Sequence, residues 1–261
     1  MPDCETYEVF AVKYAERDAR RPEHFLGGDP HDVPMPMDYF VWAIVGRDRT
    51  IVVDTGFDTV DAVTRNRRLV RTAAEGLALI AVDAATAPTV VLTHLHYDHV
   101  GGFDQFPNAR FHLQDREMSF ATGRHMAESE FSHAFTARHV AEMVMAVHAK
   151  RVEFHDGDVE LAPGVSLHHI GGHTDGLQAV RVNTAAGWLV LASDASHYYE
   201  NMEASRPFPI VFDVPAMIAG YDRLRSLAGP GGRIVPGHDP MVFERHAAAD
   251  PSLTGIAVRL G

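Results

Sequence analysis

The stretch Thr93-His94-Leu95-His96-Tyr97-Asp98-His99-Val100-Gly101-Gly102 decides the fold of this chain. It places three histidines and an aspartate within six positions, directly after an apolar run at residues 90–92. Neutral imidazoles and carboxylates are the ligands that borderline divalent ions such as zinc prefer. Without a metal, each of these groups, if buried, would need its own hydrogen-bond partner or a shifted pKa. The stretch therefore predicts a metal site at the end of a buried strand.

The composition is that of a globular protein with a large core. The chain has 261 residues, 46% of them hydrophobic, and we expect a single domain over residues 1–261. Its one cysteine, Cys4, cannot form an internal disulfide, as expected in a reducing compartment. The N-terminal residues lack the features of a secretory leader, and no stretch approaches the roughly 20 apolar residues that span a bilayer. We expect a cytoplasmic protein with no membrane partner.

Charge and histidine content narrow the class of partner. The 35 acidic residues outnumber the 23 basic ones, which gives a formal net charge of −12. Such a balance works against binding a polyanion, so nucleic acid is not an expected partner.

The chain has 17 histidines, and most of them lie outside the cluster. We interpret the dispersed ones, such as His112, His125, His133, His139 and His148, as surface or hydrogen-bonded residues.

Strands and helices alternate along the chain in a pattern typical of a layered α/β or α+β domain. A helix is predicted over residues 59–75 and another over 215–227, where Pro215 occupies a favoured first-turn position. Residues 115–150 are predicted to form a helical insert, with breaks near Gly123 and Ser132. Short β-rich runs predict strands over residues 7–14, 39–45, 50–53, 89–92, 110–113, 165–170, 177–182, 188–192 and 233–235.

Two segments are candidates for the wall of a substrate pocket. Residues 21–37 are predicted to form a long loop with an apolar side, and such loops are often binding elements. The alternative is a plain surface excursion. The insert at 115–150 is rich in methionine and phenylalanine, which suit an adaptable apolar pocket but equally suit packing of the helices onto a sheet.

The remaining candidate ligands all follow predicted strands. His173 follows the strand at 165–170 through two glycines, Asp194 follows 188–192, and His238 follows 233–235. The glycines beside them let the backbone turn sharply and bring a side chain inward. Strand ends that converge on one rim can therefore build a single site together with the cluster at 94–99.

This ordered set resembles the metallo-β-lactamase superfamily, whose hallmark is His-x-His-x-Asp-His followed by separate His, Asp and His ligands. The resemblance runs from Asp54-Thr55-Gly56 to Pro236-Gly237-His238. It implies an αββα sandwich of two mixed β-sheets flanked by helices, with two Zn²⁺ per chain at one edge, or Mn, Fe or Co in their place. It also implies that one ion is held by His94, His96 and His173, the other by Asp98, His99 and His238, with Asp194 bridging them.

Other positions refine the resemblance. Asp54 matches an aspartate that supports the histidine loop without binding metal, although a plain turn aspartate is the alternative. Histidine at position 96 suits a zinc hydrolase, whereas glutamate there would favour the flavo-diiron oxidoreductases. Exported β-lactamases of the dinuclear type commonly have cysteine where Asp194 stands. The match is nearest to the N-acyl homoserine lactonase group, through Gly172-His173-Thr174-Asp175-Gly176 and Ser193-Asp194-Ala195-Ser196.

The resemblance also implies a reaction. A hydroxide between the two ions would attack a lactone carbonyl, and the ions would stabilise the oxyanion. Asp98 is the expected proton shuttle to the leaving alkoxide. In the lactonase group a tyrosine three positions after the bridging aspartate contacts the substrate, but here that position is His197, with Tyr198 next. Either residue is a candidate for orienting the substrate.

We therefore expect a hydrolase that opens a lactone bearing an apolar group, with an N-acyl homoserine lactone as the leading substrate. A thioester hydrolase of the glyoxalase II kind is the first alternative, although the presence of only two lysines, Lys13 and Lys150, argues mildly against an anionic thiol carrier. A non-catalytic metal-binding protein is the second alternative. A non-catalytic protein is disfavoured because all seven ligand positions of the superfamily motif are filled in this chain. The apolar loop at 21–37 is consistent with a homodimer.

Overall fold

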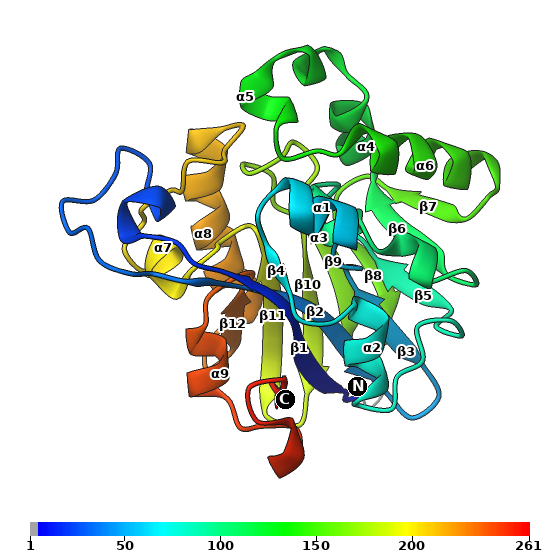
Figure 1. Cartoon of the computed structure of the whole chain (residues 1–261). Coiled ribbons are helices and arrows are strands. Elements are labelled where there is room, and N and C mark those ends of the chain that lie inside the picture. Colours follow the sequence, from blue (N-terminus) through cyan, green and yellow to red (C-terminus); the bar gives the residue numbers. More distant parts are fainter. Residues whose placement is uncertain (1–4) are drawn as a thin grey trace.

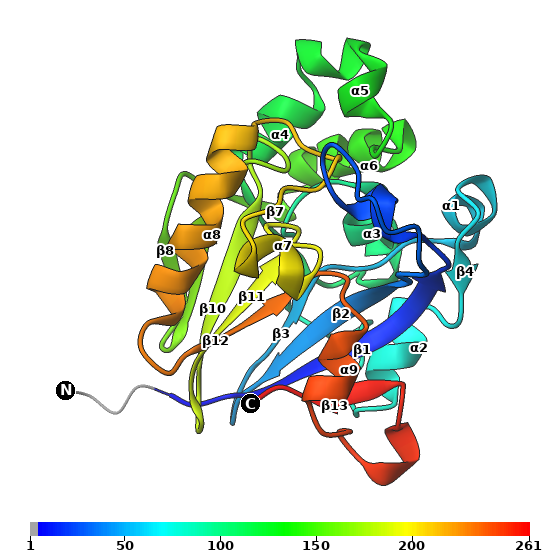
Figure 2. The same ribbon diagram turned by 90° about the vertical axis from the view of Figure 1, so that its left-hand side faces the viewer.

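The computed structural model describes residues 5–261, so Cys4 lies outside the described residues. Two mixed β-sheets pack face to face, with helices on both outer faces, as Figure 2 shows. The expected αββα sandwich is therefore confirmed. The strands of the eight-stranded sheet run in the order β13-β1-β2-β3-β5-β6-β7, with β4 paired to β1. They are β1 (Glu8–Arg17), β2 (Met37–Val45), β3 (Thr50–Val53), β4 (Arg68–Leu69), β5 (Thr89–Val91), β6 (Arg110–Gln114), β7 (Val152–His155) and β13 (Ala257–Arg259).

The second sheet has five strands in the order β12-β11-β10-β9-β8. Since β10 is antiparallel to both β9 and β11, and β12 is parallel to β11, the strands β9, β11 and β12 all end at one edge. That edge is where the candidate ligands of this sheet lie. The strands are β8 (Val159–Ala162), β9 (Val165–His169), β10 (Gln178–Thr184), β11 (Gly187–Ser193) and β12 (Arg233–Pro236).

Strand β2 shows how the sequence builds the layers. Its side chains alternate between the two faces of the sheet, as the two-residue period of a strand requires. Phe40, Trp42 and Ile44 enter the core between the sheets, whereas Tyr39 and Val41 enter the core beneath the helices. Because both faces are covered, the strand is a continuous apolar run rather than an alternating one.

Helix α8 (Val214–Ala228) covers the outer face of the second sheet, and α2 (Ala73–Ala78) covers the first (Figure 2). The side chain of Asp213 caps the start of α8 by accepting a hydrogen bond from Ala216 N at 2.9 Å, and the helix ends before Gly229. The helix expected over 215–227 is therefore confirmed.

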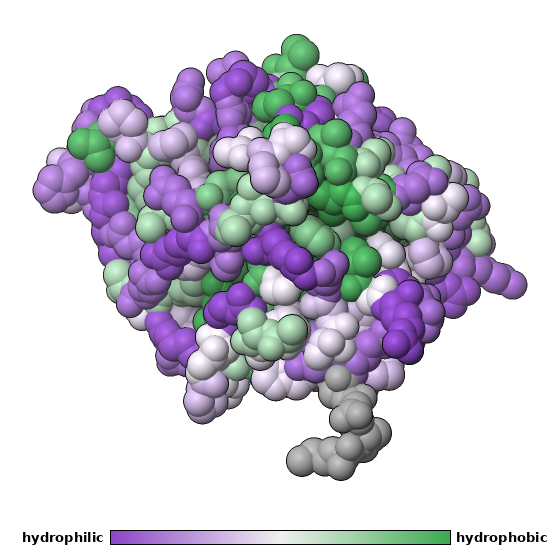
Figure 3. All heavy atoms as spheres, turned by 90° about the horizontal axis from the view of Figure 1, so that it is seen from below, coloured by the Kyte–Doolittle hydropathy of each residue, from purple (hydrophilic) through white to green (hydrophobic). Residues whose placement is uncertain are grey.

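The insert at 115–150 is helical, with breaks close to the expected positions. It comprises α4 (Asp115–Ala121), the 3₁₀ turn η3 (Arg124–Ala127), α5 (Ser129–Ser132) and α6 (Ala137–His148). Figure 1 shows α4, α5 and α6 together at one end of the sandwich. The opposite end, seen from below in Figure 3, presents a mixture of hydrophilic and apolar residues.

The helix expected over 59–75 is wrong. The chain forms α1 (Thr59–Thr64), then pairs through β4 with the end of β1, and only then enters α2. Asn66 adopts a left-handed φ of 52°, which ends the first helix. Thr72 and Glu75 form a capping box that starts the second, and this was the local signal for the break.

Several short elements complete the fold, and none was predicted. They include β7, β8 and β13 at sheet edges, and short helices between strands and loops. In the part of the chain that the structure describes, no helix is both long and apolar enough to cross a membrane. The short helical elements are η1 (Arg21–His24), α3 (Tyr97–Val100), η2 (Phe103–Gln105), α7 (Tyr199–Glu203), α9 (Met241–Arg245) and η4 (Pro251–Leu253).

Candidate metal centre

The four candidate ligands of the opening stretch lie just after β5, in the turn that starts α3. His94, His96, Asp98 and His99 are all buried, although all four carry polar side chains. Buried polar groups of this kind require partners that replace water. The structure supplies those partners from the ends of β9, β11 and β12.

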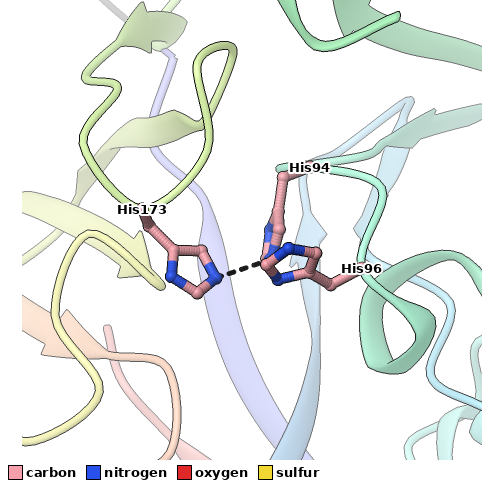
Figure 4. Close-up of side chains that lie close together, drawn as sticks. All are labelled: His94, His96 and His173. Atoms are coloured by element: carbon pink, nitrogen blue, oxygen red, sulfur yellow. Dashed lines mark hydrogen bonds between the residues drawn. The ribbon is translucent and has the colours of Figure 1, made fainter. Parts of the chain in front are cut away.

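The first group of donors consists of His94, His96 and His173, whose ligand atoms lie within 4.8 Å of one another. Figure 4 shows the three imidazole rings turned toward a common point, two from the loop after β5 and one from the loop after β9. The Nε2 atoms of His94 and His173 are 3.2 Å apart. Three imidazoles at this separation form the facial set that a tetrahedral zinc ion takes.

The second group consists of Asp98, His99 and His238, also within 4.8 Å of one another. The Oδ2 atom of Asp98 is 3.8 Å from Nε2 of His99 and 3.8 Å from Nε2 of His238. Two imidazoles and a carboxylate are again a donor set for a borderline divalent ion. Both groups open on the same buried space.

Asp194 lies between the two groups and presents one oxygen to each. Its Oδ2 atom is 3.3 Å from Nε2 of His173 and 3.9 Å from Nε2 of His94. Its Oδ1 atom is 3.0 Å from Nε2 of His238 and 3.4 Å from Nε2 of His99. A carboxylate whose two oxygens face different donor groups can bridge two ions.

The outer nitrogens of three histidines determine which inner nitrogens can bind metal. Nδ1 of His99 bonds Asp54 Oδ2 at 2.7 Å, Nδ1 of His173 bonds Ile210 O at 2.7 Å, and Nδ1 of His238 bonds Asp38 O at 2.9 Å. Because a carbonyl or carboxylate only accepts, each Nδ1 carries the proton. The neutral ring therefore directs the lone pair of Nε2 into the centre.

The lone pairs of the imidazole Nε2 atoms face the lone pairs of the carboxylate oxygens. This arrangement is repulsive unless a cation lies between them. His99 Nε2 and Asp194 Oδ1 are buried and make no hydrogen bond among the described residues. Burial lowers the pKa of His99, but the carboxylates of Asp194, Asp54 and Asp98 raise it above its usual value. A group of carboxylates that attracts protons here equally attracts divalent cations, which replace those protons. The residues therefore fit two metal ions.

The match to a family model agrees with this geometry. The model of the metallo-beta-lactamase superfamily matches residues 35–238, a span that includes every candidate ligand. The chain belongs to the metallo-β-lactamase superfamily.

Relatives in the superfamily include lactonases and other metallo-hydrolases. An N-acyl homoserine lactonase of a Bacillus species is 31% identical over 159 residues, which are 60% of this chain and 54% of the lactonase. A probable metallo-hydrolase of Mycobacterium tuberculosis is 26% identical over 240 residues, which cover 80% of this chain and 74% of that protein. The match to this chain spans about half the length of the Bacillus lactonases.

A solved structure of a lactone hydrolase has the same fold. The structure of an N-acyl homoserine lactone hydrolase, with the product N-hexanoyl-L-homoserine at its catalytic metal centre, is similar with a TM-score of 0.78. The two chains are 20% identical, and the similarity covers 93% of this chain and 97% of the other. At this level of identity the similarity shows the fold.

Two glycines allow the superfamily ligands to meet in this chain. Gly172 has a φ of 86°, and a Cβ there would lie 2.6 Å from the backbone of Met217. A Cβ on Gly237 would lie 2.5 Å from Asp194 Oδ1. Each of these distances is shorter than real Cβ contacts allow, so a side chain at either position would push a candidate ligand away.

Buried carboxylates outside the donor set hold the ligand loops. Asp54 accepts hydrogen bonds at Oδ1 from the backbone N–H of Thr93, at 2.7 Å, and at Oδ2 from His99. Glu117 accepts from Leu95 N at 2.9 Å and from the hydroxyl of Thr174 at 2.6 Å, so it joins the loop after β5 to the loop after β9. The role expected for Asp54 matches its contacts, whereas the role of Glu117 had no recognisable signal in its helical segment.

His197 and Tyr198, the two candidates for orienting a substrate, point in different directions. Nε2 of His197 lies 3.0 Å from Asp194 Oδ2, and its ring stacks on Phe208 at 3.6 Å. Burial lowers the pKa of His197 to about 3. The hydroxyl of Tyr198 instead donates to Pro36 O at 3.1 Å, in the N-terminal loop. His197 lines the cavity beside the metal centre, and Tyr198 does not.

The cavity beside the metal centre has a volume of about 90 Å³. The loop at 21–37 lines it through Glu23, His24 and Met37, so this loop is a wall of the site. The helical insert contributes only His133 and Ala134 to the cavity. Its aromatic and methionine side chains pack instead into or against the hydrophobic core, apart from the exposed Met145. Those core-packed side chains are Met118, Phe120, Met126, Phe131, Phe135 and Met143.

Several residues of the cavity wall were not predicted from the sequence. Tyr39, Arg17, Arg65 and Arg67 all line it, and they come from β1, β2 and the segment between α1 and β4. Nothing in their local sequence indicates a functional position. They lie together because the end of β1 pairs with the start of β2 and with β4, which directly follows Arg67.

Proposed function

We propose that this chain is a dinuclear zinc-dependent hydrolase that opens a lactone ring, with an N-acyl homoserine lactone as the leading substrate. The proposal rests on Asp194, because its two oxygen atoms face two separate donor groups. A mononuclear or purely structural zinc site has no use for such a bridge. The names of the Bacillus relatives support the choice of a lactone.

Bound zinc would supply a water of lowered pKa as nucleophile and a positive charge for the developing oxyanion. We assign proton transfer to Asp98, because it borders the cavity and its backbone carbonyl is held by the hydroxyl of Tyr14 at 2.7 Å. A carboxylate on an anchored backbone can pass a proton to the leaving alkoxide, which is a poor leaving group without one.

We assign substrate orientation to His197, since it lines the cavity and its ring is fixed by Phe208 on one face and Asp194 at one edge. The apolar wall made by Met37, Phe208 and Ile210 suits a hydrophobic group on the substrate. A packed imidazole and an apolar wall hold a ring near the nucleophile at little entropic cost.

Metal analysis and a panel of esters test this proposal. We expect two zinc ions per chain and hydrolysis of N-hexanoyl homoserine lactone, with little activity on a thioester or a phosphoester of similar size. Asp98→Asn should retain its circular dichroism spectrum and lose activity by about 100-fold or more, as expected for a group that acts on the transition state.

Asp104→Asn is the matched control, because Asp104 is an exposed carboxylate in the neighbouring 3₁₀ turn and does not line the cavity. It should behave as the unmodified protein does. Full activity of Asp98→Asn would refute the assigned role. Hydrolysis of the thioester but not the lactone would favour the glyoxalase II alternative, and two bound ions with no hydrolysis of any ester would favour a metal-binding protein.

A further inference from the structure

Arginines gather at one side of the cavity, in a chain whose formal charge is −12. Arg17, Arg65 and Arg67 line the cavity beside the metal centre. Two of them, Arg17 and Arg67, also line a second, larger cavity of about 640 Å³. These two guanidinium groups therefore stand where the two cavities adjoin.

Arg67 is held firmly by neutral partners, and the charge of Asp98 acts on it without direct contact. Its Nε donates to the hydroxyl of Tyr97 at 3.0 Å, and its Nη1 donates to the carbonyl of Arg65 at 2.5 Å. Among residues 5–261, its Nη2 makes no hydrogen bond and no carboxylate lies within 4.0 Å of its guanidinium. The side chain is half-buried, so one fixed N–H group is left to serve a ligand.

Arg17 is similar in having donors to spare. Its Nη2 pairs with Glu23 Oε2 at 2.5 Å, while its Nε and Nη1 make no hydrogen bond within the described part of the chain. Arg65 differs from both, because its nitrogens already bond Asp61, Thr136 and backbone carbonyls. Arg65 is therefore structural.

The other charges of the second cavity are largely neutralised by one another. Lys13 pairs with Glu16 at 2.6 Å and with Asp38 at 2.9 Å, and Arg68 pairs with Glu16 as well. Asp18 is the remaining carboxylate in the wall, and it is exposed. Arg17 and Arg67 are thus the cations that a ligand reaching from one cavity into the other would meet.

We propose that Arg17 and Arg67 recognise a carboxylate on the substrate, so that the preferred substrate is a lactone whose side arm carries a negative charge. This inference rests on the proposed function and narrows its substrate class. A guanidinium presents N–H donors in a planar fork that matches a carboxylate, and such charge-assisted bonds are among the stronger ones. The half-buried position of Arg67 limits screening by solvent.

Two lactones of the same shape test the proposal. N-succinyl homoserine lactone ends in a carboxylate, and N-(4-methylpentanoyl) homoserine lactone has an isopropyl group in its place. We expect the zinc-loaded protein to hydrolyse the first with a kcat/KM about tenfold higher, the size of one charge-assisted hydrogen bond. In Arg67→Met the ratio should fall to about one, mainly through KM.

Arg47→Met is the matched control, since Arg47 lies in the turn between β2 and β3, makes no ion pair among the described residues and does not line either cavity. It should keep the tenfold ratio. A ratio near one in the unmodified protein, or an unchanged ratio in Arg67→Met, would overturn the inference while leaving the lactonase proposal standing.

Calorimetry of the two ring-opened products separates the two proposals. If neither lactone is hydrolysed, the lactonase proposal fails, but the dissociation constants of N-succinyl homoserine and N-(4-methylpentanoyl) homoserine still test the arginines. Tighter binding of the succinyl compound to the unmodified protein, lost in Arg67→Met, supports the carboxylate site. Equal binding of the two products contradicts it.

Discussion

Asp54 and His99 are joined by a buried hydrogen bond of 2.7 Å between Oδ2 and Nδ1. Asp54 itself adopts a left-handed φ of 62°, which is unusual for a residue with a side chain. Its other oxygen holds the backbone of Thr93, so one carboxylate fixes both the start of the ligand loop and the ring of its last histidine. Strain at Asp54 is the cost of holding His99 in its metal-binding tautomer.

Asp54→Asn should weaken the second metal site. An asparagine amide facing His99 would donate to Nδ1, which moves the proton of the ring to Nε2 and removes the lone pair that binds metal. We expect the affinity for one of the two ions to fall by about 10- to 100-fold. Chelator competition measures this, with the exposed Asp48→Asn as control. Equal affinities in the two variants would show that the tautomer does not depend on Asp54.

Glu117→Gln should destabilise the protein without removing a ligand. The carboxylate accepts hydrogen bonds from Leu95 N, Thr174 Oγ1 and Gly176 N, all buried, and a glutamine would face one of these donors with its own N–H₂. A lost hydrogen bond to a charged group costs about 2 kcal/mol. Urea unfolding of the metal-free protein measures the difference, and the exposed Glu128→Gln should show none.

Ionised Asp61 stabilises the folded protein, and this contribution should be lost at acid pH. Burial raises the pKa of its carboxyl, but bonds from His139 at 2.6 Å, Thr136 at 2.7 Å and Arg65 bring the pKa down to about 2, below the usual 3.8. A lowered folded-state pKa stabilises the protein above the unfolded value, and that contribution disappears as the pH falls from about 4 to 2. The shift corresponds to about 2 kcal/mol.

Asp61→Asn should therefore start from a lower free energy of unfolding at neutral pH and lose less of it between pH 4 and pH 2. The quantity to compare is the slope of unfolding free energy against pH in that window, measured by urea titration of metal-free protein. Parallel slopes for the two proteins would contradict the assigned pKa.

His197→Ala should mainly lower activity, whereas Tyr198→Phe should mainly lower stability. His197 lines the cavity, so its loss should lower kcat/KM by about 10- to 100-fold, the range of a substrate-positioning group. The hydroxyl of Tyr198 bonds Pro36 O and lies 3.1 Å from His24 Nε2, so Tyr198→Phe should cost about 1 kcal/mol of stability and little activity. A large loss of kcat in Tyr198→Phe alone would reverse the two assignments.

The longer strands and the candidate donor set could be predicted from the sequence because their signals are local. Apolar runs such as residues 89–92 bury themselves in any compact fold, and a histidine or aspartate directly after such a run must lie at a strand end. The helix expected over 59–75 failed for a tertiary reason. Pairing of Leu69 with Ala15 of β1 offers the backbone a strand partner that is 54 positions away in the chain, and local propensity does not report it.

The sequence by itself determined which residues are candidate metal ligands: the cluster from His94 to His99, and the isolated His173, Asp194 and His238 after their own strands. Only the tertiary structure decided how these residues are distributed between the two donor groups. The two oxygens of Asp194 face different histidines because β11 ends between β9 and β12, and Tyr198 turns away because its hydroxyl meets Pro36. Arg17 and Arg67 became neighbours of the metal centre for the same reason, since sheet packing joins segments whose sequences share no pattern.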